Sequence, residues 1–597
     1  MKNIYLFQPQ YAVEIRKETN YWLPYSAGCL WSYAQQFDWI RENYKLGEII
    51  FRRQDPVEVI NRLVDPVFCG FSCYMWNKNY CLKLAEMVKE RWPSCVVVFG
   101  GPEASPRILD NKCIDSIVIS EGENHFVEIL RNILDGKPLE EIYAKTRLDR
   151  LDIPSPYLTG VFDDMIAAYP AAVWAMTFET NRGCPYHCTF CDWGGLTHSK
   201  VKKFELEKVA AELDWAANNP VSYMYLTDAN FGIFKERDLE IARMIRAAAD
   251  RGQIEKVNIT YAKNSTEIIF EIASVLGDLS KGITLSLQSA YDDTLEAIKR
   301  KNMDINNIQH MLATGAAKNI GTYSEFIIGL PLETLESWKQ GFDHVLEMGQ
   351  HNALEVWPCQ LLENTELNSF DSRMKYGIKS VLAQDYMPYH NADDHTDIVE
   401  NIQLVTQTNT MSKDDMVEGF VYGWMVMLFH YQGYTKLTSQ WTRKIHGVSY
   451  RKFYDRLYEL IHTDTFFAPL VDYLKTNIKH YLDKGYFIDQ KMAGHTITYT
   501  HHKLVYENKS IAYDIAKQCA STFVTEVDEI DSLQRLSLYN SNLTLPMTIS
   551  IPWDINSWTA EPSEYIISTN IVINRDLDFY IARRTGVLYN IFTKKSK

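Results

Sequence analysis

The chain has 597 residues, enough for roughly three or four domains, and its 46% apolar and 23% charged residues are typical of a folded globular protein. Its formal net charge of −15 disfavours a nucleic-acid substrate, because the chain as a whole repels phosphate backbones. The apolar run at the N-terminus is too short for a signal peptide, and the most apolar later stretch, at 420–431, is shorter than the roughly 20 residues of a membrane helix. The odd count of eleven cysteines, without a disulfide framework, favours the reducing cytoplasm.

The first 136 residues alternate strand and helix patterns. This alternation predicts a parallel, doubly wound (Rossmann-like) sheet that binds ligands at the carboxyl ends of its strands. The expected strands lie at 4–7, 48–51, 67–72, 96–99 and 116–119, and the expected helices at 27–36, 56–63, 77–91 and after Glu123.

Three loops at the carboxyl ends of these strands carry candidate ligand-binding residues. A pair of glycines after a buried strand lets the backbone approach a ligand closely, although a plain tight turn gives the same pattern. Together the loops resemble those of the cobalamin-binding domain that is fused to many radical S-adenosylmethionine (SAM) enzymes, and residues 21–28 resemble the approach to the first helix in that family. The resemblance implies cobalamin binding by Ser72, Cys73, Trp76, Asn77, Gly100, Gly101, Pro102, Glu103, Glu121, Gly122 and Glu123.

One position departs from the cobalamin-binding mutases. Those proteins carry Asp-x-His-x-x-Gly after the first strand, and its histidine ligates cobalt, whereas residues 8–13 here read Gln-Pro-Gln-Tyr-Ala-Val. The resemblance is therefore to the subgroup that binds cobalamin with its base detached, in which the loop at 73–77 lies near the lower face of the cobalt. Dinucleotide binding is a competing interpretation, but no GxGxxG follows the first strand.

Residues 137–172 read as a linker, in which Pro154 and Pro156 stiffen an extended path.

A cysteine motif follows the next apolar run. Cys184, Cys188 and Cys191 are spaced as CxxxCxxC. Three thiolates suit a [4Fe–4S] cluster with one unligated iron, whereas zinc normally needs a fourth protein ligand, for which His187 is a candidate. The motif resembles that of the radical SAM superfamily, whose members chelate SAM at the open iron.

Six strand–helix units between 173 and 368 predict a partial (β/α)₆ barrel of the TIM type, with reactive groups at the carboxyl ends of its strands. The strands are expected at 173–179, 223–226, 256–261, 283–287, 324–328 and 354–358. The resemblance implies SAM contacts at these strand ends and between the cysteines, although Asp228 or Glu333 taken alone would more often be a helix cap. The residues concerned are Tyr186, Phe190, Asp228, Asn230, Ser286, Gln288, Gly329 and Glu333.

From 369 to 597 the pattern becomes mostly helical and rich in aromatic residues, with helices expected at 416–430 and 450–462 and short strands at 496–500 and 548–551. We expect an accessory or substrate domain here. Trp424, His430, Tyr431 and Trp441 are candidates for a substrate pocket, although such stripes more often belong to a hydrophobic core.

Taken together, the two resemblances imply a cytoplasmic cobalamin-dependent radical SAM enzyme with a [4Fe–4S] cluster, SAM and cobalamin as cofactors. We expect a methyltransferase that uses a 5′-deoxyadenosyl radical to methylate an unactivated carbon of a small-molecule or peptide substrate, with an electron donor such as flavodoxin or ferredoxin. Three alternatives stay open: an oxidative cyclisation or rearrangement without methyl transfer, a non-catalytic cobalamin-binding module, and methylthiolation of transfer RNA. The last would call for further cluster cysteines and a basic appendage, and neither is evident in the sequence.

Overall fold

The computed structural model describes residues 1–11, 13–15, 18–144, 148, 150–193, 201–263, 267–280, 282–318, 320–385, 397–489, 500–536, 547–552, 554, 558–559, 561–567 and 592–594. The chain divides into two compact units. The first unit comprises Met1–Ser280, Gln360–Arg373 and Leu382–Gln403, and the second comprises Lys281–Cys359, Met374–Val381 and Leu404–Lys597. The domain boundaries expected near residues 136, 172 and 368 stay predictions.

The first unit begins with a six-stranded parallel sheet in the order β4-β1-β5-β6-β7-β8. The strand order reverses beside β1, which is the position where doubly wound sheets open a crevice for a ligand. All five predicted strands are present, and the short β8 was not predicted. The bounds are β1 Lys2–Gln10, β4 Tyr44–Arg52, β5 Pro66–Ser72, β6 Val96–Gly100, β7 Ser116–Ile119 and β8 Ile142–Ala144.

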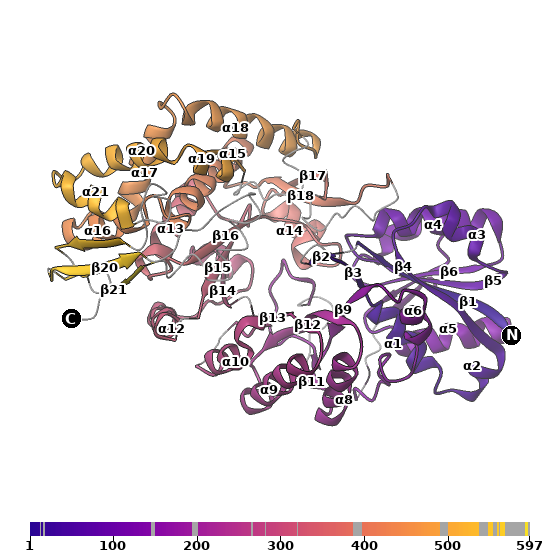
Figure 1. Ribbon diagram of the computed structural model, residues 1–597. Coiled ribbons are helices and arrows are strands. Elements are labelled where there is room, and N and C mark those ends of the chain that lie inside the picture. The colour runs from indigo at the N-terminus through magenta and orange to yellow at the C-terminus, as the bar shows by residue number, and fades with distance from the viewer. Residues whose placement is uncertain are drawn as a thin grey trace. The chain divides into compact units, whose positions relative to one another are not determined.

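Helices cover both faces of this sheet (Figure 1). α3 (Pro56–Arg62) and α4 (Lys78–Arg91) pack on one face against apolar side chains such as Phe7 and Phe71, because alternate residues of a strand point to the same side. α1 (Tyr25–Ala34) and α5 (Glu123–Asp135) cover the other face, and the short α2 (Asp38–Asn43), which was not predicted, follows α1.

A second sheet in the first unit has the order β13-β12-β9-β3-β2. Its strand β3 comes from the N-terminal part of the chain and pairs in parallel with β9, Tyr21 opposite Trp174. Residues 21 and 22 therefore belong to a strand of this second sheet, and α1 begins only at Tyr25. The bounds are β2 Val13–Ile15, β3 Glu18–Trp22, β9 Val173–Phe178, β12 Val221–Phe231 and β13 Lys256–Tyr261.

Helices and short strands accompany this second sheet. The linker contains α6 (Asp163–Ala168), and α8 (Leu206–Ala217), α9 (Lys235–Arg251) and α10 (Ile268–Leu276) follow along the chain. Beside the cysteine motif, β10 (Asn181–Arg182) pairs with β11 (Lys202–Lys203).

The second unit contains the remaining three strands that the sequence predicts for the barrel, paired in parallel in the order β14-β15-β16. All six predicted strands are thus present, each followed by helix. The bounds are β14 Ile283–Gln288, β15 Thr322–Ile328, β16 Ala353–Pro358, α11 Asp292–Ala297, α12 Ile305–Ala317 and α13 Leu335–Glu347. Short elements follow: α14 Phe370–Lys375, β17 Lys379–Gln384 and β18 Asn401–Gln407.

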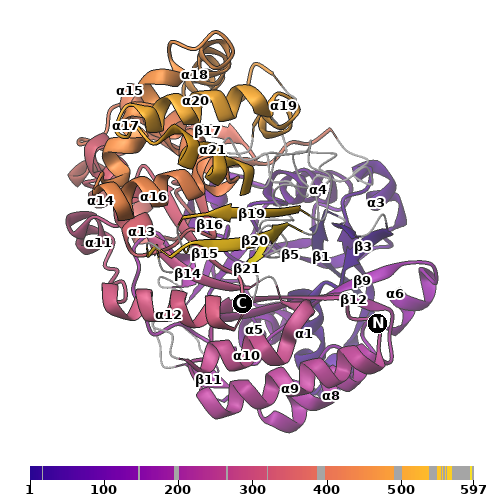
Figure 2. The same ribbon diagram turned by 60° about the vertical axis from the view of Figure 1, so that its left-hand side comes forward.

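The C-terminal part of the second unit is mostly helical (Figure 2), which confirms the expected class. Trp424, His430 and Trp441 are completely buried and Tyr431 nearly so, as expected for a core. The predicted strand at 496–500 lies, apart from Thr500, outside the described residues. No described helix is long and apolar enough to cross a membrane. The bounds are α15 Lys413–Val426, a π-helical turn Met427–Tyr431, α16 Lys436–His446, α17 Tyr450–Ile461, α18 Phe467–Lys484, α19 His502–Glu507, α20 Lys509–Ser521, α21 Val527–Leu536, β19 Met547–Ile551, β20 Ser563–Ile567 and β21 Phe592–Lys594.

Candidate active site

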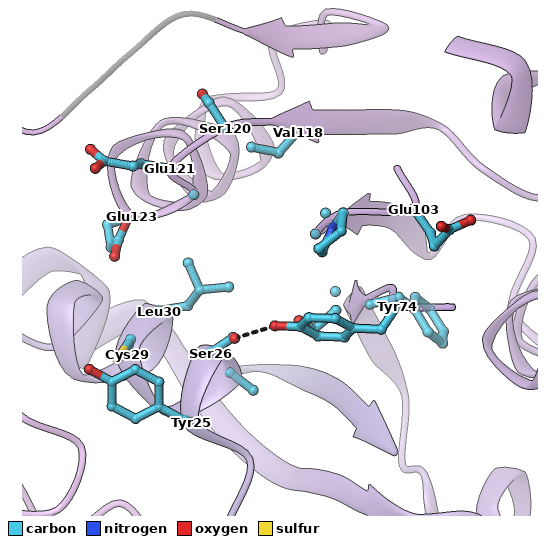
Figure 3. Close-up of a pocket in the computed structure, with 18 of the residues that line it drawn as sticks. Tyr25, Ser26, Cys29, Leu30, Tyr74, Glu103, Val118, Ser120, Glu121 and Glu123 are labelled. Atoms are coloured by element: carbon cyan, nitrogen blue, oxygen red, sulfur yellow. Dashed lines mark hydrogen bonds between the residues drawn. The ribbon is translucent and has the colours of Figure 1, made fainter. Parts of the chain in front are cut away.

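A cavity of about 650 Å³ lies in the first unit at the carboxyl ends of the parallel strands. Nine of the eleven residues predicted to bind cobalamin line it, and the other two, Cys73 and Asn77, hold the same loops in place. Figure 3 shows Glu121 and Glu123 on one side of this cavity and Tyr74 and Glu103 on another, with Ser26 and Leu30 of α1 nearby. The loops that the sequence singled out therefore surround one space.

Part of the cavity lies between the sheet and helices α1 and α5, where its lining is apolar. Gly70 in β5 keeps room there, because a Cβ atom at this position would come within 2.8 Å of the Phe68 ring and 3.0 Å of the Leu6 side chain. The result is a slot suited to a flat apolar group. Its lining residues are Leu6, Phe68, Gly70, Val98 and Val118 from the sheet, and Leu30, Phe126 and Ile129 from the helices.

The loop after β5 is fixed by its own side chains. Asn77 accepts a hydrogen bond from the Tyr74 amide (2.7 Å) and donates to the carbonyls of Ser72 and Pro9, each at 3.0 Å. The rings of Tyr74 and Trp76 stack with their centroids 4.5 Å apart, and the Tyr74 hydroxyl bonds Ser26 of α1. Trp76 therefore has a defined position in the cavity wall, and its buried Nε1–H has no hydrogen-bond partner among the described residues.

At the end of β6, close packing against the loop after β5 requires a glycine at position 101. Gly101 has a φ of +96°, and a Cβ atom there would lie 2.7 Å from the Cys73 carbonyl oxygen. The Cys73 amide donates to the Gly100 carbonyl (2.7 Å) and its carbonyl accepts from the Glu103 amide (3.1 Å). The two cavity loops thus form one hydrogen-bonded layer.

An ion-pair network lies where the cavity meets the cysteine motif. Arg182 donates two hydrogen bonds to Glu179, each at 2.9 Å, and one to Glu123 at 3.0 Å, and it lies 3.7 Å from Glu121. Tyr25 of α1 also donates to Glu179, at 3.2 Å. Glu123 is buried, and within the part of the chain that the structure describes its second oxygen, Oε2, has no hydrogen-bond partner. Arg182 therefore joins the loop after β7 to the residues that lead into the cysteines.

The same cavity extends to the cysteine motif, because Gly183, Cys191 and Asp192 also line it. Cys184 and Cys188 are buried and Cys191 is partly exposed. Asn230 donates to the Cys184 sulfur (3.3 Å) and Lys263 to the Cys188 sulfur (3.4 Å). Burial, and to a smaller extent Glu103, raises the pKa of Asp192 to about 7.

The donor set of the cysteine motif fits an iron–sulfur cluster better than zinc. In the described part of the chain, no three His, Cys, Asp or Glu side chains converge on one point as a single metal ion requires. A [4Fe–4S] cube spreads its ligands, since each thiolate binds its own iron. His187, the candidate fourth zinc ligand, is exposed.

Asp228, predicted to contact SAM, has its carboxylate fully engaged by the start of the cysteine loop. It accepts hydrogen bonds from the backbone amides of Thr180 (2.7 Å) and Asn181 (3.1 Å), from the Thr180 hydroxyl, and from Asn181 Nδ2 (2.5 Å). Burial raises its pKa to about 7 although these bonds favour the charged form. A direct contact of Asp228 with SAM stays a prediction.

Near the motif, Lys263 also lies over the Tyr186 ring, 5.3 Å from its centroid, and Phe190 is partly buried.

In the second unit, the predicted residues at the ends of β14 and β15 are connected to other side chains. Ser286 donates to Glu325 (3.0 Å), and Gln288 has a φ of +66°, which is unusual for a residue other than glycine. Gly329 has a φ of +94°. Glu333 is buried and accepts from the hydroxyls of Ser289 and Ser337, each at 2.6 Å. The N-cap of α13 is Thr334, so the helix-cap interpretation is wrong for Glu333.

Several residues at the site were missed by the sequence interpretation. Glu179 and Arg182 lie within five residues of Cys184, so a charged pair directly before the motif was the available signal. Lys263 follows the predicted third strand of the barrel and was identifiable only by that position. Nothing in the sequence indicated Glu363 and Asn364. They contact the loop after β6 although more than 250 residues of sequence separate them from it.

Residues 178–345 match the family model of the radical SAM superfamily. The chain is 36% identical to the "Cobalamin-dependent radical SAM methyltransferase TokK" of Streptomyces tokunonensis over 492 residues, which are 77% of this chain and 71% of that protein. It is also 36% identical to the 2-(S-pantetheinyl)-carbapenam-3-carboxylate methyltransferase of Streptantibioticus cattleyicolor, over 73% of this chain and 67% of that protein.

Among solved structures, the radical SAM methyltransferase TsrM from Kitasatospora setae, with cobalamin and a [4Fe–4S] cluster bound, matches with a TM-score of 0.48 and 15% identity. The match covers 64% of this chain and 77% of that protein. A likeness at this level supports no conclusion about this chain.

Proposed function

The chain belongs to the family of cobalamin-dependent radical SAM methyltransferases, and from that membership we propose that it transfers a methyl group to an unactivated carbon of a small molecule. Its cofactors are a [4Fe–4S] cluster, SAM and cobalamin. When bound, these groups supply the electron, the 5′-deoxyadenosyl radical and the methyl group, and the protein supplies binding, orientation and exclusion of water.

One observation carries the proposal: a single cavity is lined both by the loops after β5, β6 and β7 and by Cys191 of the cysteine motif. Radical formation at a cluster and methyl donation from cobalamin have to reach the same carbon atom. A shared cavity meets this requirement, because it holds reacting groups at short distances without diffusion between separate sites.

The residues around the cavity fit cobalamin. The corrin ring carries primary amides that both donate and accept hydrogen bonds, and the cavity offers two buried, unpartnered atoms of matching kind, the donor Trp76 Nε1 and the acceptor Glu123 Oε2. The slot beside Gly70 would hold the detached base of the cofactor, because its lining is made of aliphatic and aromatic side chains. We therefore assign the loop after β5 to one face of the corrin and the slot to the nucleotide end.

The cluster loop would be held by the chain's own hydrogen bonds. Cys184, Cys188 and Cys191 would each ligate one iron, leaving the fourth iron for SAM. Asp228 orients the strand end before the first cysteine through four hydrogen bonds, and Arg182 ties the same segment to Glu123 of the cobalamin side. These contacts orient the loop before any substrate arrives.

We propose a small molecule as the substrate and not a peptide, because the Streptantibioticus relative is named for a small carbapenam carboxylate. We also propose a one-electron donor such as flavodoxin or ferredoxin, and a cytoplasmic location. The eleven cysteines show no disulfide framework in the sequence, which favours a reducing environment.

The proposal is tested with the reconstituted enzyme, a chemical reductant and SAM that carries an isotopically labelled methyl group. 2-(S-pantetheinyl)-Carbapenam-3-carboxylate serves as the first substrate probe. Label on a carbon of the product, located by nuclear magnetic resonance, supports the proposal. Label on a heteroatom would contradict the proposal. An oxidised or rearranged product without label would also contradict it and would favour an oxidative enzyme. A matched reaction with Cys191→Ala controls for methylation without the cluster.

A further inference from the structure

A buried ion pair joins two distant parts of the first unit. Arg53 follows β4, and Glu400 precedes β18 by one residue, so the partners are 347 residues apart in sequence. Their side chains are 1% and 0% exposed, and Nη1 of Arg53 lies 2.5 Å from Oε1 of Glu400. Burying two charges is unfavourable unless both are fully hydrogen-bonded, so the other partners of the pair are informative.

Glu400 occupies the N-terminus of α4. Its carboxylate accepts hydrogen bonds from the backbone amides of Asn79 (2.7 Å) and Tyr80 (3.1 Å), which are among the first amides of the helix and have no acceptor within it. The residue at the N-cap, Asn77, gives the helix no side-chain hydrogen bond because its side chain holds the preceding loop. A carboxylate from a distant segment therefore caps the helix and interacts favourably with its dipole.

Arg53 holds the end of the cavity loop. Its Nη1 donates to the carbonyl of Trp76 (3.1 Å) and its Nη2 to the carbonyl of Ile398 (2.6 Å). The guanidinium also lies over the rings of Tyr11 and Tyr80, 4.5 and 5.0 Å from their centroids. The planar group is thus held by two aromatic rings and by the hydrogen bonds along its edge, a set of contacts that an ammonium cannot reproduce.

The two halves of the pair act on the same short stretch, residues 76–80. Arg53 fixes the carbonyl of Trp76, and Glu400 fixes the amides of Asn79 and Tyr80. Trp76 is the residue of this stretch that lines the cavity, stacked on Tyr74. Loss of both anchors would leave the position of the indole to its stack on Tyr74 and to the hydrogen bonds of the neighbouring Asn77.

Resting on the cobalamin site described above, we propose that the Arg53–Glu400 pair is a positioning device that holds the Trp76 indole against the bound corrin and keeps water from the cobalt on that side. Arg53 and Glu400 act through Trp76 and do not line the cavity themselves. Displacement of the indole would open space on this side of the cavity, and water would then reach the bound cofactor there.

The test uses the full chain with cobalamin and compares Arg53→Lys with the double variant Arg53→Met/Glu400→Leu. The double variant removes both charges and leaves neither one buried alone, so the chain keeps its fold while the contact with the Trp76 carbonyl is lost. The readouts are the electron paramagnetic resonance spectrum of cob(II)alamin, the affinity for cobalamin and the melting temperature. A matched control is Arg62→Met/Glu48→Leu, which removes a more exposed ion pair from the same sheet domain.

We expect both Arg53 variants to change the cob(II)alamin spectrum toward a water-ligated form and to weaken cobalamin binding severalfold. The melting temperature of the double variant should be close to that of the control. A folded double variant with the unaltered spectrum and affinity would overturn the proposal, because the pair would then be structural only. Failure of the unsubstituted chain to bind cobalamin would instead overturn the cofactor assignment, so the two failures are distinguishable.

Discussion

At the scale of single residues, the cysteine motif depends on three thiols that no other residue can replace. Replacing Cys184, Cys188 or Cys191 by Ala removes one iron ligand, and we expect the anaerobically reconstituted protein to lose the cluster absorbance at about 400 nm and all cleavage of SAM. Absorbance and iron analysis measure this directly. Cys113→Ala is the control, because Cys113 is also buried but lies in the sheet domain and should leave both signals intact. Full cluster content in the triple alanine variant would contradict the assignment.

The buried Asp228 predicts a particular pH dependence. Burial raises its pKa to about 7 in the folded chain, against about 3.9 for an unfolded aspartate. The folded state therefore binds this proton more tightly, and the residue's contribution to stability is full below about pH 4 and is lost as the pH rises through about 7. The melting temperature of the wild type relative to Asp228→Asn should decline by a few degrees from about pH 5 to about pH 8. A constant difference across this range would mean that the carboxylate is already ionised at the lower pH.

The cavity also predicts the coordination of cobalt. Among the described residues that line it there is no histidine, and the Trp76 indole nitrogen is a donor that cannot ligate a metal. Bound cob(II)alamin should therefore show no superhyperfine splitting from a coordinated nitrogen in its electron paramagnetic resonance spectrum. Splitting from either a protein imidazole or the base of the cofactor would refute this expectation.

At the scale of elements, the loop after β6 is braced by the segment Gln360–Arg373 of the same unit. Asn364 donates from its amide to the carbonyls of Pro102 (2.8 Å) and Ala104 (3.0 Å), and Glu363 accepts from Ser105 (2.8 Å). Each hydrogen bond contributes about 1 kcal/mol, so Asn364→Ala should weaken cobalamin binding by about tenfold if the loop loses its bound shape. Titration of the apo chain with cobalamin measures this.

Asn218→Ala is the control for the brace, because Asn218 makes a similar side-chain bond to the Asp214 carbonyl on an exposed helix end. An unchanged affinity in Asn364→Ala would show that the loop holds its shape without the brace. The melting temperatures of both variants separate a loss of binding from a loss of fold.

The elements differ in how well the sequence predicted them. Strands such as β13 (Lys256–Tyr261) and β7 (Ser116–Ile119) were predicted with the bounds that they have, because their sequence pattern is local. The five-residue β3 was not predicted, because its partner β9 lies about 150 residues away and only that pairing makes it a strand. The cysteine spacing identified the cluster loop, whereas Arg53, Glu400 and Asn364 carry no local pattern and are brought to the cavity loops only by folding.

At the scale of the whole molecule, one cavity of the first unit is lined both by the loops proposed to bind cobalamin and by Cys191 of the cysteine motif. The proposed reaction combines radical formation with methyl donation. The two processes use SAM differently. The radical route releases methionine and 5′-deoxyadenosine, whereas methylation of cobalamin releases S-adenosylhomocysteine. No single pathway makes both products from one SAM molecule, so the product mixture reports whether both processes occur.

Turnover should therefore give 5′-deoxyadenosine and S-adenosylhomocysteine in about equal amounts, with one methyl group on the product. Chromatography of the quenched reaction, with mass detection, measures both nucleosides. The Cys191→Ala variant should lose 5′-deoxyadenosine, because its cluster lacks one ligand. Omission of cobalamin should instead abolish S-adenosylhomocysteine and leave slow, uncoupled release of 5′-deoxyadenosine. A mixture that holds 5′-deoxyadenosine without S-adenosylhomocysteine in the complete reaction would exclude methyl transfer through cobalamin and favour an oxidative reaction at the same cavity.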